Sequence, residues 1–398
     1  MKNIEIVLSQ IEEVLYNKAV KMQNPVIEQD LGALLFFATY YNYSGENIYK
    51  QKSLILLDKL FEVFSDFELP TGLLEGFDGI GWVIHYLKEC NIIESEELIE
   101  DLDSYLIQSI RLNITNNNYD LLYGSIGKIQ YLINSDRCKE LFVVELVNGI
   151  VEKLYETKVE INGLIYWHEL DSEKVNLGLA HGLPSILLFL LRLKELGYQN
   201  PLIIKMINGI LRSFKKFKNK VPNMSSYGVC YPISKKLNSH SRLAWCYGDL
   251  GIAYALMYTS KVLKSKKVEE ESKEMINLIL NRGISDSGLV HFNDYSFFDT
   301  GFCHGISGIS YFLYKFNELL PSQSIEDSLV YWEMELLKNI ETQLSINTPI
   351  YYPKFRQDLD KTYTIDKENL LNGICGVGLV LLSLKYKRAD WSDIFLLY

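Results

Sequence analysis

The stretch Arg242-Leu-Ala-Trp-Cys-Tyr-Gly-Asp-Leu-Gly251 places an arginine, a cysteine and two aromatic residues directly before a pair of glycines. An apolar segment, Ile252 to Tyr258, follows this pair. The same design returns in Gly301-Phe-Cys-His-Gly-Ile-Ser-Gly308, which precedes the apolar segment Ile309 to Phe316. A design that recurs along a chain indicates an internal repeat, and the repeat determines the fold.

Similar stretches, each leading into an apolar segment, mark six copies of the repeat. They are Leu74-Glu-Gly-Phe-Asp-Gly79, Leu122-Tyr-Gly-Ser-Ile-Gly127, Ala180-His-Gly-Leu-Pro-Ser185, Trp245-Cys-Tyr-Gly-Asp-Leu-Gly251, Phe302-Cys-His-Gly-Ile-Ser-Gly308 and Leu371-Asn-Gly-Ile-Cys-Gly376. Their first glycines are 48, 58, 66, 57 and 68 residues apart, and Asp30-Leu-Gly32 resembles a further, eroded copy. The third copy departs from the pattern, because Ser185 stands where a second glycine is expected.

The pattern of apolar residues predicts two kinds of helix. The segments after the glycines are apolar almost all the way round, which is typical of a helix buried on every side. Between them lie amphipathic segments such as Ile4 to Tyr16 and Leu202 to Phe217, whose apolar residues recur at three- and four-residue steps. Neither end of the chain resembles the polar cap of an open solenoid. We therefore expect an all-α fold over residues 1–398, a single α,α-toroid with about seven inner and seven outer helices.

Three segments interrupt the helical pattern near residues 161–170, 221–240 and 347–366. They are rich in tyrosine, β-branched residues and, in the last two, proline, a composition that favours short strands or loops. We interpret them as insertions at the rim of the ring. They either carry binding residues or serve only as crossings between helices.

Composition excludes some classes of function. A net charge of −10 argues against a nucleic-acid partner, because neutralising phosphates requires a basic surface. No apolar run approaches the ~20 residues of a membrane span, and no signal peptide is apparent. Six cysteines without a dense framework suit a reducing cytoplasm, in which their thiols are available to a metal.

The residues with distinctive chemistry gather just before the glycine pairs. They are Asp120, His181, Arg242, Trp245, Cys246, Tyr247, Cys303 and His304. If every glycine pair opens an inner helix at the same rim, these side chains converge on one mouth of the ring. Titratable groups that converge in a central concavity indicate an active site.

Cys246, Cys303 and His304 form a candidate metal site. Two thiolates and one imidazole suit Zn²⁺ better than a hard cation, and three protein ligands with one open position are typical of a catalytic zinc. We therefore expect one zinc ion per chain, with water or a substrate thiol as the fourth ligand. Two other interpretations remain open, namely cysteines that merely pack in the core and a disulfide between Cys246 and Cys303.

The motifs Ala180-His-Gly, Arg242-Leu-Ala-Trp-Cys-Tyr-Gly and Cys303-His-Gly resemble those of the lanthionine synthetase C-like family, in particular its stand-alone lantibiotic cyclases. The resemblance covers the whole chain. It implies an α,α-toroid with a central zinc site. It also implies an enzyme that closes thioether rings, by adding cysteine thiols of a precursor peptide to dehydroalanine or dehydrobutyrine in the same peptide.

The candidate residues can be fitted to that chemistry. Zinc would bind the substrate thiol as a thiolate, and addition would create an enolate that must be stabilised and protonated. His181 is the candidate acid, and Asp120 would orient His181 or Arg242, although acid and base are not yet distinguished between His181 and Asp120. Arg242 would stabilise the oxyanion with Tyr247 as a second donor, and Trp245 is a further candidate for the catalytic site. The alternative for Trp245 and Tyr247 is that they only pack the rim. Arg242 has a structural alternative as an ion-pair partner of Asp120.

The same resemblance implies the partners. The substrate would be a dehydrated precursor peptide with a leader segment, and a dehydratase and an ABC exporter would bring the cytoplasmic enzyme to the membrane. A second hypothesis is a non-catalytic protein of the same fold that uses zinc to bind a small thiol such as glutathione. A third is a toroidal glycosidase that uses Asp120 and Asp249, although it leaves both cysteines unexplained.

Overall fold

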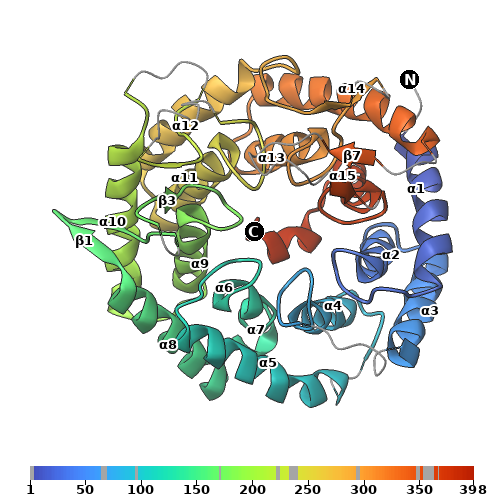
Figure 1. Ribbon diagram of the computed structural model, residues 1–398, viewed down its shortest axis with the longest axis horizontal. Helices are drawn as coiled ribbons and strands as arrows, with labels where there is room; N and C mark the ends of the chain where they lie inside the picture. The colour runs from blue at the N-terminus through green and yellow to red at the C-terminus, as the bar shows by residue number, and fades with distance from the viewer. Residues whose placement is uncertain are drawn as a thin grey trace.

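The computed structural model describes residues 4–63, 70–94, 97–169, 172–220, 225–232, 241–292, 296–346, 350–352, 363–365 and 367–398. Within them, seven helices form an outer ring (Figure 1). These are α1 (Ile4–Ala19), α3 (Asn47–Val63), α5 (Glu97–Thr115), α8 (Leu141–Thr157), α10 (Pro201–Phe217), α12 (Lys266–Leu280) and α14 (Gln323–Ser345). A short 3₁₀ helix, η2 (Asp136–Lys139), precedes α8.

The inner ring also has seven positions, one of which is divided between two short helices. Its helices are α2 (Asp30–Ser44), α4 (Asp78–Glu89), α6 (Ser125–Lys128) with α7 (Gln130–Ile133), α9 (Leu183–Glu195), α11 (Asp249–Leu263), α13 (Ile306–Leu319) and α15 (Ile374–Tyr386). Each inner helix packs against an outer neighbour. The α,α-toroid predicted from the repeat is thus confirmed.

Burial explains why the two rings have different sequences. Helix α15 is buried at every residue from Ile374 to Leu384, so an apolar residue is favourable on all of its faces. Helix α10 instead buries one face, which includes Ile203, Met206 and Ile210, while its lysines face outward. The inner helices therefore form the core of the ring and the outer helices separate it from water.

The first and last parts of the chain meet and close the ring. Helix α15 packs against both α1 and α2. Beyond α15, Arg388 donates a hydrogen bond to the carbonyl oxygen of Asn42 at 2.6 Å, and the backbone N–H of Asp390 donates to the Tyr43 hydroxyl at 2.9 Å. Closure leaves neither α1 nor α15 as an uncovered end.

Four two-stranded antiparallel sheets lie between the helices of the described chain. They pair β1 (Val159–Ile161) with β2 (Leu164–Tyr166), β3 (Val175–Asn176) with β4 (Cys230–Tyr231), β5 (His291–Phe292) with β6 (Phe297–Phe298), and β7 (Ile350–Tyr352) with β8 (Tyr363–Ile365). Short strands occur in all three segments where the sequence indicated strands or loops. Much of those segments, including residues 221–224, 233–240 and 353–362, lies outside the described residues. The hairpin β5–β6 was not predicted.

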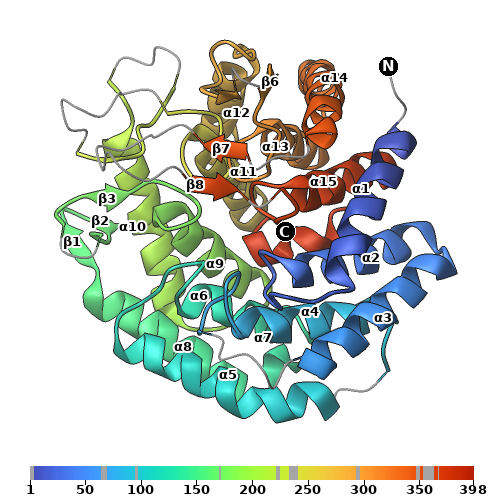
Figure 2. The same ribbon diagram turned by 45° about the vertical axis from the view of Figure 1, so that its right-hand side comes forward.

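The last residues of the chain fill the middle of the ring. The 3₁₀ helix η3 (Asp390–Phe395) and the residues up to Tyr398, called the C-terminal plug below, lie inside the inner ring in both views (Figure 1 and Figure 2). Trp391, Phe395 and Leu397 have no exposed surface. The hydroxyl of Tyr254 donates to the backbone oxygen of Tyr398 at 2.6 Å. The ring is therefore packed through its centre and is not an open pore.

None of the helices among the described residues is both long enough and apolar enough to cross a membrane.

Candidate active site at the mouth of the ring

Five of the inner helices begin directly after the first glycine of a pair. Gly124, Gly182, Gly248, Gly305 and Gly373 are the residues before α6, α9, α11, α13 and α15. The loop before each helix folds tightly against its glycine. A Cβ atom on Gly305, for example, would lie 2.3 Å from the backbone nitrogen of Gly301. The glycines thus permit a tight loop at each helix start.

Backbone hydrogen bonds link these loops around the mouth, the face of the ring where they meet. The links run from Glu28 N to Leu74 O at 3.0 Å, Leu73 N to Leu122 O at 2.8 Å, Ala180 N to Cys246 O at 3.4 Å, Trp245 N to Cys303 O at 2.9 Å, Cys303 N to Leu371 O at 2.7 Å, and Leu370 N to Glu28 O at 3.0 Å. We call this arrangement the loop circle. It joins successive repeats and the two ends of the chain, and between the loops of Leu122 and Ala180 the link is a side-chain contact of His181 with Asp120.

Position within the loop decides how far a side chain reaches the surface. The residue immediately before each first glycine keeps exposed area, namely Glu75, Tyr123, His181, Tyr247, His304 and Asn372. In five of these repeats the preceding residue is buried, namely Leu74, Leu122, Ala180, Cys246 and Cys303. The loop circle therefore presents two histidines and two tyrosines at the mouth, above two buried thiols.

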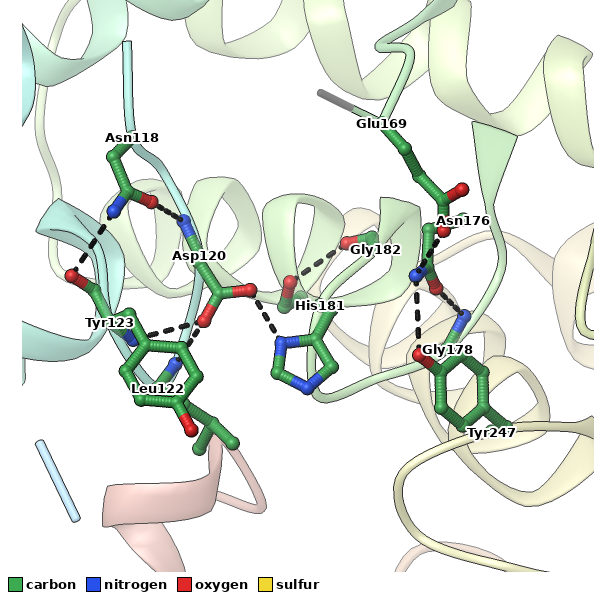
Figure 3. A network of polar contacts seen from close by, with 11 residues as sticks. Asn118, Asp120, Leu122, Tyr123, Glu169, Asn176, Gly178, His181, Gly182 and Tyr247 are labelled. Carbon is green, nitrogen blue, oxygen red and sulfur yellow. Dashed lines mark hydrogen bonds and ion pairs between the residues drawn. The ribbon is translucent and has the colours of Figure 1, made fainter. Parts of the chain in front are cut away.

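His181 forms a pair with Asp120 from the preceding repeat (Figure 3). Its Nδ1 lies 2.6 Å from Asp120 Oδ2, while Asp120 Oδ1 accepts the backbone N–H groups of Leu122 and Tyr123 at 2.7 and 2.9 Å. Burial lowers the pKa of His181, but the hydrogen bond and charge of Asp120 outweigh it, so the pKa is raised. The carboxylate thus favours a protonated His181.

Aromatic rings flank His181. The Tyr123 ring is nearly parallel to the imidazole, with 6.2 Å between centroids and 4° between planes, and the Tyr247 ring lies 6.5 Å away. A pocket of about 50 Å³ adjoins His181 on the side of the hairpin β1–β2, with Trp167 and Glu169 in its lining. These neighbours restrict the direction from which a substrate approaches the imidazole.

Cys246 and Cys303 are brought together under the mouth. Both are buried, the backbone N–H of Cys246 donates to the carbonyl oxygen of Cys303 at 3.4 Å, and the Arg242 guanidinium donates to Cys246 Sγ at 3.7 Å. The side-chain hydrogen bond from Cys303 is the main cause that lowers the pKa of Cys246, with the nearby charges of Arg242 and His304 acting in the same direction. The same hydrogen bond raises the pKa of Cys303. Both residues are free thiols, so the disulfide alternative does not hold in this structure.

His304 lies beside the thiols and is oriented by a carboxylate of its own loop. Its Nδ1 is 2.6 Å from Asp299 Oδ2. Among the described residues, no group of three or more His, Cys, Asp or Glu side chains is arranged so that it could hold a metal ion. Cys246, Cys303 and His304 nevertheless fit Zn²⁺ in their chemistry, because thiolate and imidazole are its preferred ligands.

Comparison with known proteins shows the family of the chain. The sequence profile of the lanthionine synthetase C-like proteins matches residues 29–396. The chain belongs to this family.

Several lanthionine synthetase C-like relatives can be compared directly. The chain is 25% identical to the nisin biosynthesis protein NisC of Lactococcus lactis subsp. lactis over 401 residues, covering 92% of this chain and 87% of that protein. It is 24% identical over 205 residues to the glutathione S-transferase LANCL1 of Danio rerio, covering 48% of this chain and 45% of that protein. Its fold matches the solved structure of nisin cyclase with a TM-score of 0.75 at 20% identity, covering 99% of this chain and 96% of that one.

Trp245 lies beneath the mouth of the ring and is not at the surface of the protein. It has no exposed area, and its ring packs against Phe302 at 5.9 Å and against Phe395 of the C-terminal plug at 5.1 Å. Its Nε1 has no hydrogen-bond partner among the described residues. Of the predicted catalytic residues, Trp245 is thus the one that the fold separates from the mouth.

Asn176 and Glu169 were not predicted, although they join the network around Tyr247 (Figure 3). Asn176 Nδ2 donates to Glu169 Oε1 at 2.9 Å and to the Tyr247 hydroxyl at 3.5 Å, while its Oδ1 accepts the N–H of Gly178 at 2.8 Å. A signal for Asn176 does exist in the lanthionine synthetase C-like repeat. It precedes Gly182 by six residues, as Asp299 precedes Gly305.

Proposed function

We propose that this chain is a zinc-dependent cyclase that forms lanthionine and methyllanthionine rings in a dehydrated precursor peptide. The observation that carries the proposal is the contact of Cys246 with Cys303 beside His304, in the loop circle that also holds the His181–Asp120 pair. Membership of the family and the similarity to NisC across most of both proteins support it.

Cys246, Cys303 and His304 would hold one zinc ion, which would supply an electrophilic centre that keeps the substrate cysteine as a thiolate near neutral pH. In the reaction the substrate thiol loses its proton, its sulfur bonds to the β-carbon of a dehydroalanine or dehydrobutyrine, and the α-carbon gains a proton. The peptide keeps its mass, and no oxidant or reductant is required.

His181 would deliver the proton to the α-carbon. Asp120 raises its pKa, which keeps the imidazole protonated at a higher pH than an isolated histidine allows. Asp120 would also fix the ring, since Asp120 Oδ1 is itself held by two backbone N–H groups. This arrangement supports His181 as the acid and Asp120 as the group that orients it.

Arg242 and Tyr247 would stabilise the enolate oxygen that forms as sulfur adds. Arg242 lies beside Cys246, and the Tyr247 hydroxyl is oriented by Asn176. Both groups can donate a hydrogen bond to an oxyanion. Trp245 would support Cys246 from below through its contacts with Phe302 and Phe395.

The proposed substrate is a precursor peptide with a leader segment, dehydrated beforehand at serine and threonine. That chemistry requires a dehydratase to act first. We place the reaction in the cytoplasm, next to an exporter at the membrane, as the family resemblance implies.

A non-catalytic protein that binds a small thiol at the same zinc is the second candidate. The similarity of about half of the chain to LANCL1, which is named a glutathione S-transferase, supports a small thiol such as glutathione as the ligand. In that case the zinc and its ligands would be needed, but no thioether ring would form in a peptide.

Metal analysis of the purified protein tests the proposed site. We expect about one zinc per chain in the wild type and none in a variant with Cys246→Ala and Cys303→Ala. A matched variant with Cys90→Ala and Cys375→Ala removes two buried cysteines elsewhere, one directly after α4 and one in α15, and should keep its zinc. Zinc that is absent from the wild type, or retained by the first variant, contradicts the site.

Incubation with a synthetic peptide that contains one cysteine and one dehydrobutyrine tests the reaction. A cyclase removes the free thiol without changing the peptide mass, as iodoacetamide labelling and mass spectrometry would show. A thiol that persists in the presence of zinc-loaded protein contradicts cyclisation and favours the thiol-binding alternative.

A further inference from the structure

His181 and His304 occupy the same position in two repeats, one residue before the first glycine. In each, Nδ1 lies 2.6 Å from a carboxylate oxygen. The carboxylates come from different places, because Asp120 belongs to the preceding repeat, whereas Asp299 precedes His304 by only five residues in the same loop. The two pairs therefore match in contact geometry and differ in how the carboxylate is held.

Asp299 is buried more deeply than Asp120. Its side chain is 2% exposed, against 19% for Asp120. Asp299 Oδ1 accepts the N–H of Gly301 at 2.9 Å, its backbone N–H donates to Val290 of the β5–β6 segment at 2.9 Å, and its backbone oxygen accepts the N–H of Ile306 at 2.8 Å. The backbone of Asp299 is therefore tied to the β5–β6 segment and to the first turn of α13, and its carboxylate is held by the N–H of Gly301.

An ionised carboxylate can only accept hydrogen bonds, so the hydrogen at Nδ1 belongs to His304. With Nδ1 protonated in a neutral imidazole, the lone pair of the ring resides on Nε2. Metal-bound histidines in proteins generally have this arrangement, in which a carboxylate or carbonyl selects the tautomer and raises the basicity of the coordinating nitrogen.

From these contacts we infer that Asp299 is a positioning residue. It locks His304 in the tautomer and ring orientation that present Nε2 to zinc. The inference rests on the proposed zinc site and adds to it the residue that prepares His304. It also explains why two histidines at equivalent positions differ in role. The buried carboxylate of Asp299 orients His304 as a metal ligand, whereas the more exposed carboxylate of Asp120 orients His181 as a proton donor.

Replacing Asp299 by asparagine tests the inference. Asn keeps the size of the side chain and an oxygen for Gly301, but it removes the charge and sets an amide nitrogen or a weaker acceptor against Nδ1. In competition with a zinc-binding indicator we expect the zinc affinity of Asp299→Asn to fall by about 10- to 100-fold. Turnover should fall with zinc occupancy and recover when zinc is saturating.

Asp120→Asn is the matched control, since it removes the same atom from the equivalent pair of His181. Its zinc affinity should stay within about twofold of the wild type, although its turnover falls, because Asp120 does not contact a proposed ligand. If Asp299→Asn binds zinc as tightly as the wild type, the inference is overturned while the cyclase proposal stands. A wild type that binds no zinc overturns both.

A measurement on the wild type avoids any dependence on how the variant folds. In the zinc-loaded protein labelled with ¹⁵N at histidine, the resonances of His304 can be assigned by their loss in His304→Gln. We expect a protonated Nδ1 and a metal-bound Nε2. The opposite assignment, with zinc on Nδ1, contradicts the positioning role of Asp299 and leaves the zinc site itself intact.

Discussion

At the scale of the residue, the exposure and the contacts of each side chain at the mouth depend on the few atoms around it. The His181 imidazole is partly exposed and paired with Asp120, whereas the Cys246 thiol is buried beside Arg242 and Cys303. The proposed proton donor His181 thus stands at the exposed position of its loop. Of the proposed metal ligands, Cys246 and Cys303 stand at the buried position, and His304 at the exposed one.

The pH dependence of turnover should report the His181–Asp120 pair. Asp120 raises the pKa of His181, so the protonated acid persists to higher pH. In Asp120→Asn this support is lost and the pKa of His181 falls, so the decline of kcat on the alkaline side should move to lower pH. A kcat profile from pH 5 to 10 measures the shift.

Asp249→Asn serves as the control for that profile. Asp249 is also a buried carboxylate, but it accepts the backbone N–H groups of Ser226 and Tyr227 and contacts no histidine in the described contacts. Its alkaline limb should coincide with that of the wild type. If the alkaline limb of the kcat profile does not shift in Asp120→Asn, His181 is not the acid.

At the scale of the element, the glycines before the inner helices hold the loops close enough for the thiols to meet. Gly305 begins α13 directly after His304, and its missing side chain leaves room for the backbone of Gly301. The position of Cys303 and His304 thus depends on a glycine, which has no reactive side chain.

Gly305→Ala should therefore destabilise the protein and disturb the site. The new Cβ would lie 2.3 Å from the backbone nitrogen of Gly301, which cannot move without shifting the Cys303–His304 loop. We expect the free energy of unfolding to fall by more than about 1 kcal/mol and zinc affinity to fall with it. Urea denaturation and metal competition measure the two effects.

Gly149→Ala in the middle of α8 provides the opposite case. Its Cβ would meet only Ile114 Cδ1, at an ordinary 3.6 Å, so the gain in helix propensity should raise the free energy of unfolding by about 0.5–1 kcal/mol. Equal effects of the two substitutions would show that the tight loop before α13 is not the cause.

The glycine repeat also shows what the sequence can and cannot predict. The pairs locate the starts of most inner helices, because a tight loop needs glycine wherever it occurs. They do not reveal that Trp245 is buried, since that depends on Phe395 from the far end of the chain. Asp299 escaped prediction for a similar reason, because its contact with His304 exists only once the loop has folded.

At the scale of the whole molecule, the C-terminal plug joins the centre of the ring to the floor of the site. Phe395 packs against Trp245 and Phe302, and these two residues adjoin Cys246 and Cys303 in the chain. Residues 390–398 lack the repeat pattern, so only the closed ring explains why they are buried. We therefore expect the stability of the protein to be coupled to zinc binding at the proposed site.

Phe395→Ala should expose this coupling. Loss of a fully buried aromatic ring costs about 3–5 kcal/mol, and the cavity would open directly under Trp245. We expect a lower free energy of unfolding together with weaker zinc binding. Leu141→Ala, at an exposed position of α8, should change stability by no more than about 0.5 kcal/mol. If the zinc affinity of Phe395→Ala is unchanged, the C-terminal plug does not influence the proposed zinc site.

The hydrogen bond between Leu371 N and the Glu28 carboxylate joins residues 343 positions apart, at the seam where the loop circle closes. Helical hairpins form from neighbouring residues, whereas such a distant contact must wait for most of the chain. During synthesis on the ribosome, Cys246, Cys303 and His304 therefore emerge as separate residues long before the seam can form. If zinc binds as proposed, its capture is a late event of folding, and a chain interrupted before Leu371 would leave its thiols in an incomplete circle.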